Sequence, residues 1–180
     1  MTSHGNGSSS RASKTAMVTG TSTGIGRAIA LLLARRGFRV FAGVRRSEDA
    51  ASLRNEGGPN IVPIEIDVTR EDSVTAAARE VASLLDGRGL DGLVNNAGIG
   101  LTAPMEYVAM GAVRRQFDVD VFGPIAVTQA FLPLVRRSGG RIVNIGSVGG
   151  HLAIPFGGVL SACKSALGVV SDALREKVRT

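Results

Sequence analysis

The feature that most constrains this chain is the segment at residues 19–26, where three glycines separate two segments of different pattern. Residues 15–18 have the pattern of a short buried strand, and Ile29, Leu32 and Leu33 then recur at helical spacing. A sharp strand-to-helix turn needs residues without a Cβ, and the unpaired N–H groups at the start of the helix attract phosphates. The segment therefore predicts a nucleotide cradle, with an ordinary flexible turn as the alternative.

The rest of the chain alternates between buried-strand and helical patterns. Strands are predicted near residues 15–18, 39–44, 61–66, 90–94 and 141–145. Helices are predicted near residues 24–36, 47–55, 70–85, 104–110 and 111–136, and from residue 158 onward, with Thr69 as the expected cap of the third. This order predicts an α/β fold of the Rossmann type, a doubly wound parallel sheet in a three-layer α/β/α arrangement. A ligand is then expected at the carboxyl ends of the strands.

Length and composition indicate one domain. The chain has 180 residues, 44% of them hydrophobic and 20% charged, which suits a globular protein with a core of its own. Residues 1–13 are rich in Ser and Gly, so we expect a disordered tail there and a single dinucleotide-binding domain over residues 14–180.

The charge and cysteine content narrow the classes of partner. The net charge of +6 is scattered over arginine pairs without interleaved aromatics, which favours a phosphorylated cofactor over a nucleic acid. The one cysteine, Cys163, excludes an internal disulfide and fits a reducing compartment. The sequence shows no metal-ligand spacing, no apolar stretch of bilayer-spanning length and no apolar region of a signal peptide. We therefore expect a cytoplasmic protein without a metal site or a membrane span.

Three further motifs point to a known family. Asn95-Asn96-Ala97-Gly98 follows the fourth predicted strand, Ile145-Gly146-Ser147 ends the fifth, and Lys164 lies in the last helix. With the glycine turn, these residues resemble the short-chain dehydrogenase/reductase family of the classical type, in particular its hydroxysteroid and retinol dehydrogenase branch. The resemblance runs in order from about residue 14 to residue 180.

The resemblance implies a set of cofactor-binding residues. Its dinucleotide would lie against the glycine turn, then against Asp67 and Val68 beside adenine, the loop after the fourth strand, and Lys164 on the nicotinamide ribose. The residues are Gly20, Thr21, Ser22, Gly24, Ile25, Gly26, Asp67, Val68, Asn95, Ala97, Gly98 and Lys164. For Asp67 the alternative is to cap the next loop or helix, and for the 95–98 loop it is a structural turn.

The end of the second predicted strand indicates the choice of cofactor. No carboxylate stands at residues 40–46, where an NAD site would bind the ribose hydroxyls, and Arg45 and Arg46 stand there instead. An arginine can pair with a 2′-phosphate. We therefore expect NADP, with Arg45 as the first candidate and Arg46 as the second; NAD stays possible, and the alternative for both arginines is a solvated surface pair.

The catalytic residues implied by the resemblance are incomplete. Ser147 and Lys164 match the family serine and lysine, but Leu160 stands where the resemblance predicts the tyrosine that exchanges a proton. Asp120 stands where an asparagine is expected, and it either pairs with Lys164 or is a polar residue of the helix interior.

The leading functional hypothesis is an NADP-preferring oxidoreductase that interconverts an alcohol and a carbonyl by hydride transfer, with impaired activity. The apolar segment at residues 151–156 favours a lipophilic small-molecule substrate, and the helices at 111–136 and from 158 suggest a homo-oligomer. The family continues beyond the helix of Lys164, so we expect a truncated form that lacks the last family strands. The alternatives are a non-catalytic nucleotide-binding or interaction protein, and a truncated product without independent activity.

Overall fold

The protein forms one parallel sheet with helices on both faces. A computed structural model describes residues 13–178, so the predicted tail at residues 1–13 lies, apart from Ser13, outside the described residues. The strands are β1 (Thr15–Val18), β2 (Arg39–Val44), β3 (Ile61–Glu65), β4 (Gly92–Asn95) and β5 (Arg141–Asn144), in the order β3-β2-β1-β4-β5. The direction of winding reverses between β1 and β4, which leaves a crevice at their carboxyl ends. The predicted Rossmann-type sheet is confirmed.

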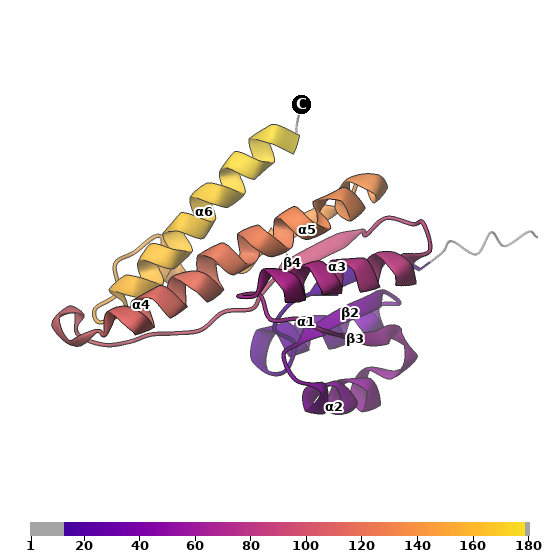
Figure 1. Ribbon diagram of the computed structural model, residues 1–180, viewed down its shortest axis with the longest axis horizontal. Helices are drawn as coiled ribbons and strands as arrows, with labels where there is room; N and C mark the ends of the chain where they lie inside the picture. The colour runs from indigo at the N-terminus through magenta and orange to yellow at the C-terminus, as the bar shows by residue number, and fades with distance from the viewer. Residues whose placement is uncertain (1–12, 179–180) are drawn as a thin grey trace, which may run out of the picture.

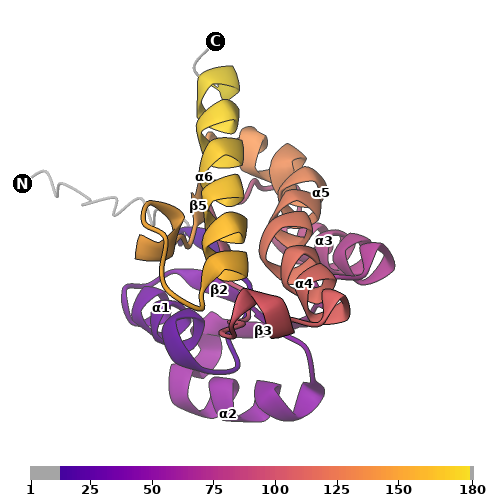
Figure 2. The same ribbon diagram turned by 90° about the vertical axis from the view of Figure 1, so that its left-hand side faces the viewer.

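The helices form the two outer layers (Figures 1 and 2). They are α1 (Gly24–Arg35), α2 (Ser47–Gly57), α3 (Glu71–Leu85), α4 (Met110–Phe117), α5 (Gly123–Ser138) and α6 (Gly158–Val178). Helices α1 and α2 enclose one buried cluster with residues such as Val40 and Leu53, while α3 and α5 enclose a second around Phe41 and Phe131. Helix α6 packs beside α4, away from α1 and α2.

The buried face of α1 differs from the face expected from its leucines. Leu32 is 47% exposed, whereas Ala30, Leu31 and Ala34 are buried against the sheet. Ile29 and Leu33 pack only partly against that core. At the start of α1 the buried residue is Gly26, which has no side chain and so suits a tight turn after β1.

The predicted helix at residues 111–136 is interrupted. Helices α4 and α5 are joined by a π-helical segment, Asp118–Phe122, so that residues 110–138 form one long but irregular helix. The wider turn places Asp120 and Val121 toward the interior. The short helix expected at residues 104–110 is only a 3₁₀ turn, Met105–Tyr107.

The same long helix bears on the expectation that no segment spans a membrane. In the described part of the chain, Met110–Ser138 is the one helix long and apolar enough to cross a bilayer by length and composition alone. Much of its apolar surface is used inside the fold, because Val127, Phe131 and Val135 are buried against the sheet. A core helix of this kind passes the same test, so the finding is weak evidence for a span.

Candidate functional site: a dinucleotide cavity and an incomplete catalytic group

The glycine segment lies at the junction of β1 and α1, where the sequence predicts it. Strand β1 ends at Val18 and helix α1 begins at Gly24. Gly20 and Gly24 have φ angles of +69° and +60°, a left-handed conformation that favours glycine. Thr23 at the N-cap makes no side-chain hydrogen bond to the helix. The first N–H groups of α1 are therefore not capped by Thr23, which suits a bound anion.

Hydrogen bonds from neighbouring strands fix the shape of this turn. Thr21 donates to the carbonyl of Gly43 from both its N–H, at 2.9 Å, and its hydroxyl, at 3.0 Å. The amide Nδ2 of Asn96 donates to the carbonyls of Thr19 and Gly20, both at 3.0 Å. Thr21 is thus buried and holds the turn in place. Asn96, half-buried, holds the turn from the loop after β4; the sequence analysis did not include it among the site residues.

Gly26 shows why the turn excludes side chains. An added Cβ there would overlap Asn96 Nδ2 and the carbonyl oxygen of Gly20. At Gly20 an added Cβ would lie 2.8 Å from the Cα of Ala97. The two glycines let the turn pack against the loop after β4, so they shape the cradle through the protein's own packing.

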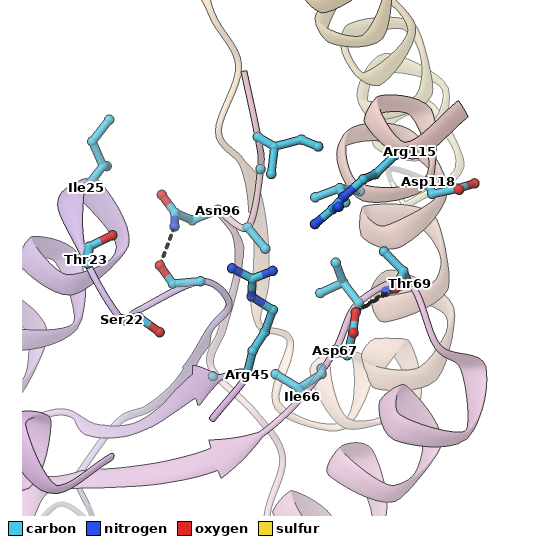
Figure 3. A pocket seen from close by; sticks show the side chains of 17 residues that line it. Ser22, Thr23, Ile25, Arg45, Ile66, Asp67, Thr69, Asn96, Arg115 and Asp118 are labelled. Atoms are coloured by element: carbon cyan, nitrogen blue, oxygen red, sulfur yellow. Dashed lines mark hydrogen bonds between the residues drawn. The ribbon is translucent and has the colours of Figure 1, made fainter. Parts of the chain in front are cut away.

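Next to the turn lies a cavity of about 480 Å³, at the carboxyl ends of the central strands (Figure 3). Of the predicted cofactor residues, Gly20, Ser22, Ile25, Arg45, Asp67, Val68, Ala97 and Gly98 line it. Thr21, Gly24, Gly26, Asn95 and Lys164 do not line it. The cavity is also lined by side chains that the sequence analysis did not assign to the cofactor site, among them Thr69, Ile99, Arg115 and Val119.

Asn95, a predicted cofactor residue outside the cavity, has structural contacts instead. Asn95 is buried, and its Nδ2 donates to Thr128 Oγ1 at 3.0 Å and to Asn144 Oδ1 at 2.8 Å. Asn144 in turn donates to Ser171 in α6 at 2.7 Å. Asn95 therefore connects β4 to α5 and β5, and through Asn144 to α6, rather than facing the cavity.

Asp67 lines the cavity and also organises the loop after β3. Its Oδ1 accepts hydrogen bonds from the N–H of Thr69 at 3.0 Å and from the hydroxyl of Thr69 at 2.7 Å. Partial burial opposes ionisation of Asp67, but these bonds and the nearby Arg45 and Arg70 outweigh it, so the pKa of Asp67 lies below its usual value. Asp67 is thus an ionised turn residue, as in the alternative considered from the sequence.

Thr69 does not cap α3, contrary to the expectation from the sequence. Helix α3 begins at Glu71 after an N-cap at Arg70 that makes no side-chain cap. The hydroxyl of Thr69 is instead used by Asp67, two residues earlier. The nearby carboxylate of Asp67 competes with the start of α3 for the Thr69 hydroxyl, which explains the error.

The two arginines after β2 have different surroundings. Arg45 lines the cavity and points into it in Figure 3, while Arg46 does not line it. Neither side chain forms an ion pair within residues 13–178. The structure therefore places Arg45, the first candidate for a 2′-phosphate contact, at the cavity, and Arg46, the second candidate, outside it.

The remaining catalytic candidates lie near a second cavity of about 310 Å³ between the end of β5 and α6. Ser147 and Lys164 both line it, together with His151. Ser147 Oγ accepts a hydrogen bond from Gly149 N at 3.1 Å, and Lys164 Nζ donates to the carbonyl of Ile145 at 3.1 Å. Leu160 lies in the first turn of α6, half-buried, and brings no proton donor to this group.

Asp120 does not form the ion pair with Lys164 that was one of its two expected roles. Within the described residues the pair has no N···O contact of salt-bridge length, and the Asp120 carboxylate instead accepts hydrogen bonds from Ile99 N, at 2.9 Å, and from Gln116 Nε2. Both Asp120 and Gln116 are fully buried. Asp120 is thus a buried polar residue of the helix interior, the other expected role.

The Asp120 carboxylate also acts on the thiol of Cys163, which is fully buried in α6. Burial and, second, the charge of Asp120 raise the pKa of Cys163 from 9.0 to about 11. A raised thiol pKa stabilises the fold below pH 9, and this contribution is lost as the pH rises toward about 11. Between pH 9 and 11 the melting temperature of Cys163→Ala should therefore fall less than that of the parent protein.

A charge variant provides the control for that prediction. In Asp120→Asn the thiol loses its negative neighbour, so we expect Cys163 to ionise at a lower pH in an absorbance titration of the thiolate. An unchanged thiol titration in the folded variant would show that burial alone sets this pKa.

The fold and the cavity define a class, a Rossmann-type domain with a cavity at the switch point of its sheet, where such domains bind dinucleotides. A sequence model described as short chain dehydrogenase matches residues 14–180. The chain belongs to the short chain dehydrogenase family, as its motifs indicate.

Similar proteins agree with that assignment. The chain is 40% identical to human retinol dehydrogenase 16 over 166 residues, which cover 92% of this chain and 52% of the relative. It is 38% identical to bovine 17-beta-hydroxysteroid dehydrogenase type 6, again over 92% of this chain and 52% of the relative. The chain spans about half the length of these curated relatives.

Solved structures show the same fold. A short-chain dehydrogenase from Streptomyces avermitilis superposes with a TM-score of 0.88 at 36% identity, over 94% of this chain and 62% of that one. An alcohol dehydrogenase from Thermococcus sibiricus in complex with 5-hydroxy-NADP gives a TM-score of 0.86 at 28% identity, over 93% of this chain and 72% of that one.

Proposed function

We propose that the protein is an NADP-preferring oxidoreductase that interconverts an alcohol and a carbonyl by hydride transfer, with low efficiency in this sequence. The observation that carries the proposal is the cavity at the switch point, which Arg45 enters from the end of β2. The carboxylates that line the cavity, Asp67 and Asp118, come from other segments of the chain. A guanidinium without a neighbouring β2 carboxylate favours a phosphorylated ribose.

The residues of the turn fit the phosphate part of such a cofactor. Ser22, Thr23 and Ile25 line the cavity at the start of α1, where a diphosphate would accept hydrogen bonds from backbone N–H groups. Bound NADP or NADPH would supply the hydride chemistry. The protein would hold the dinucleotide at this edge of the sheet, with Arg45 and Asp67 at its adenosine half.

The proposed low efficiency follows from Leu160. Ser147 can donate a hydrogen bond to a substrate carbonyl, and the ammonium of Lys164 adds positive charge nearby. Leucine has no proton to exchange, and the one tyrosine of the sequence, Tyr107, lies in the 3₁₀ turn before α4. Loss of a positioned acid removes about 10²–10⁴ in rate.

The proposal for the substrate is a lipophilic alcohol or carbonyl. Exposed apolar side chains gather in the segment between β5 and α6 and in the turn before α4, namely Leu152, Phe156 and Met105. The relatives named retinol dehydrogenase 16 and 17-beta-hydroxysteroid dehydrogenase type 6 support a substrate of this class.

We also propose a cytoplasmic location, supported by the buried free thiol of Cys163. The proposed homo-oligomer would form through α5 and α6.

The rival candidate is a non-catalytic nucleotide-binding protein, favoured by Leu160 beside an intact glycine turn. Titration of the purified protein with NADPH and NADH tests the shared part of both hypotheses. Single-turnover mixing of the NADPH complex with lipophilic aldehydes and ketones then separates them. Binding without any hydride transfer would support the rival, and absence of binding would reject both.

Arg45→Asp tests the choice of cofactor. We expect the dissociation constant for NADPH to rise about 10- to 100-fold, because a charge-assisted hydrogen bond is lost and a carboxylate repels the 2′-phosphate. The dissociation constant for NADH should change less than about threefold, since NADH offers hydroxyls at that position. Titration by quenching of the reduced nicotinamide fluorescence measures both.

Arg46→Asp is the matched control. The variant makes the same charge change one residue away, and Arg46 does not line the cavity. The ratio of the dissociation constants for NADPH and NADH should therefore stay unaltered. Equal losses of NADPH and NADH affinity in Arg45→Asp would contradict the proposed preference.

A further inference from the structure

Two guanidinium groups from distant parts of the chain reach into the same cavity. Arg45 comes from the end of β2, and Arg115 comes from α4 on the other side (Figure 3). Both side chains are exposed, and in the described range neither takes part in an ion pair or a side-chain hydrogen bond. The proposed 2′-phosphate contact uses Arg45, and Arg115 has no role in the proposed function so far.

The position of Arg115 on its helix places it at the mouth of the cavity. Val119 follows four residues later, which puts it one turn along the same face, and it lines the cavity half-buried. Arg115 also lines the cavity but is exposed, so it lies on the solvent side of the cavity while Val119 forms part of the wall. The nearby Asp118 points away from Arg115 and forms no ion pair with it in the described residues.

The wall around Arg115 indicates whether its guanidinium would bind a phosphate or stack on a purine. Val68, Ile99 and Val119 supply apolar surface to the cavity, which suits the flat face of a purine rather than a phosphate. Asp67 Oδ1 accepts hydrogen bonds from Thr69, and within the described residues Asp67 forms no ion pair with Arg115. Arg115 can therefore remain over the cavity as a planar cation, and such a group stacks well on an aromatic ring.

We propose that Arg115 forms a lid over the adenine of the bound dinucleotide, with its guanidinium stacked on the purine and Val119 on the wall beside it. This inference rests on the proposed function, because it needs a dinucleotide in this cavity. It assigns the two arginines different tasks: Arg45 distinguishes the 2′-phosphate, and Arg115 binds the adenine of NADPH and NADH alike.

Binding measurements on Arg115→Met test the proposal without any catalytic readout. Methionine keeps an unbranched apolar stem and removes the guanidinium, so calorimetric titration should show affinity losses of about threefold to tenfold for NADPH, NADH and ADP-ribose. The factor should be the same for all three, because each contains adenine. Arg115→Lys keeps the charge but loses the plane, and we expect it to recover less than half of the lost binding free energy.

Arg114→Met is the control, since Arg114 is an exposed arginine of the same helix that does not line the cavity. It should bind all three ligands like the parent protein. A loss confined to NADPH in Arg115→Met would make Arg115 a phosphate ligand and overturn the lid. Unchanged affinities, or full recovery in Arg115→Lys, would overturn it too. Failure of the parent protein to bind any of the three would reject the proposed function itself.

Discussion

Leu160→Tyr is expected to raise the single-turnover rate of hydride transfer by about 10²–10⁴-fold, the usual contribution of a positioned general acid. The substitution places a phenol one helical turn before Lys164, so both side chains share a face of α6. The ammonium of Lys164 favours the phenolate and so lowers the phenol pKa toward the working range. Stopped-flow mixing of the NADPH complex with a lipophilic carbonyl measures the rate.

The surroundings of residue 160 favour this outcome. Leu160 is only half-buried, so a larger ring meets less resistance there than it would in the core. Ser147 and Lys164 already line one cavity, and Lys164 is held by the carbonyl of Ile145. Leu160 does not line that cavity itself, so the tyrosine would reach the group through its position one turn before Lys164.

Leu160→Phe separates the hydroxyl from the ring. Phenylalanine fills nearly the same volume as tyrosine and has no proton to exchange, so its rate should equal that of the parent protein. If Leu160→Tyr folds and binds NADPH but reacts no faster than Leu160→Phe, the site lacks the geometry for catalysis. The non-catalytic nucleotide-binding protein would then be the better description.

The overall fold could be predicted because its signals are local. The buried runs at β1 to β5 and the helical stripe of α3 each depend on residues close in sequence, and their alternation leaves few ways to build the sheet. The glycine turn belongs to the same class of signal, since left-handed φ angles at Gly20 and Gly24 follow from the local need for a sharp reversal.

The parts that could not be predicted depend on contacts between distant segments. Arg115 enters the cavity only because the start of the long helix faces the loops after β2 and β3. The buried pair of Gln116 and Asp120 is likewise fixed by the backbone of Ile99. The π-helical turn that buries Asp120 has no distinctive residue pattern. The doubled Asn95-Asn96 was the one sequence signal for the contact of Asn96 with the glycine turn.

Gly26→Ala tests the construction of the cradle, and its effect should reach both stability and binding. The added Cβ overlaps Asn96 Nδ2 and the carbonyl oxygen of Gly20, and a backbone oxygen cannot swing aside as a flexible side chain can. Displacing Asn96 also breaks its hydrogen bonds to Thr19 and Gly20. We expect a loss of about 1–3 kcal/mol in the free energy of unfolding. Affinity for NADPH should fall more than about tenfold, since that takes only 1.4 kcal/mol.

Gly168→Ala makes the same chemical change in α6, where an added Cβ meets nothing within 4 Å. It should raise the free energy of unfolding by about 0.5–1 kcal/mol, because alanine favours a helix interior. Urea unfolding and NADPH titration of the two variants compare the same methyl group in a packed turn and in open space. If Gly26→Ala proved as stable as Gly168→Ala and bound NADPH as well, the turn would not be held against Asn96. The cavity beside the turn would then no longer be supported as the dinucleotide site, because the start of α1 would have no fixed position from which to bind a phosphate.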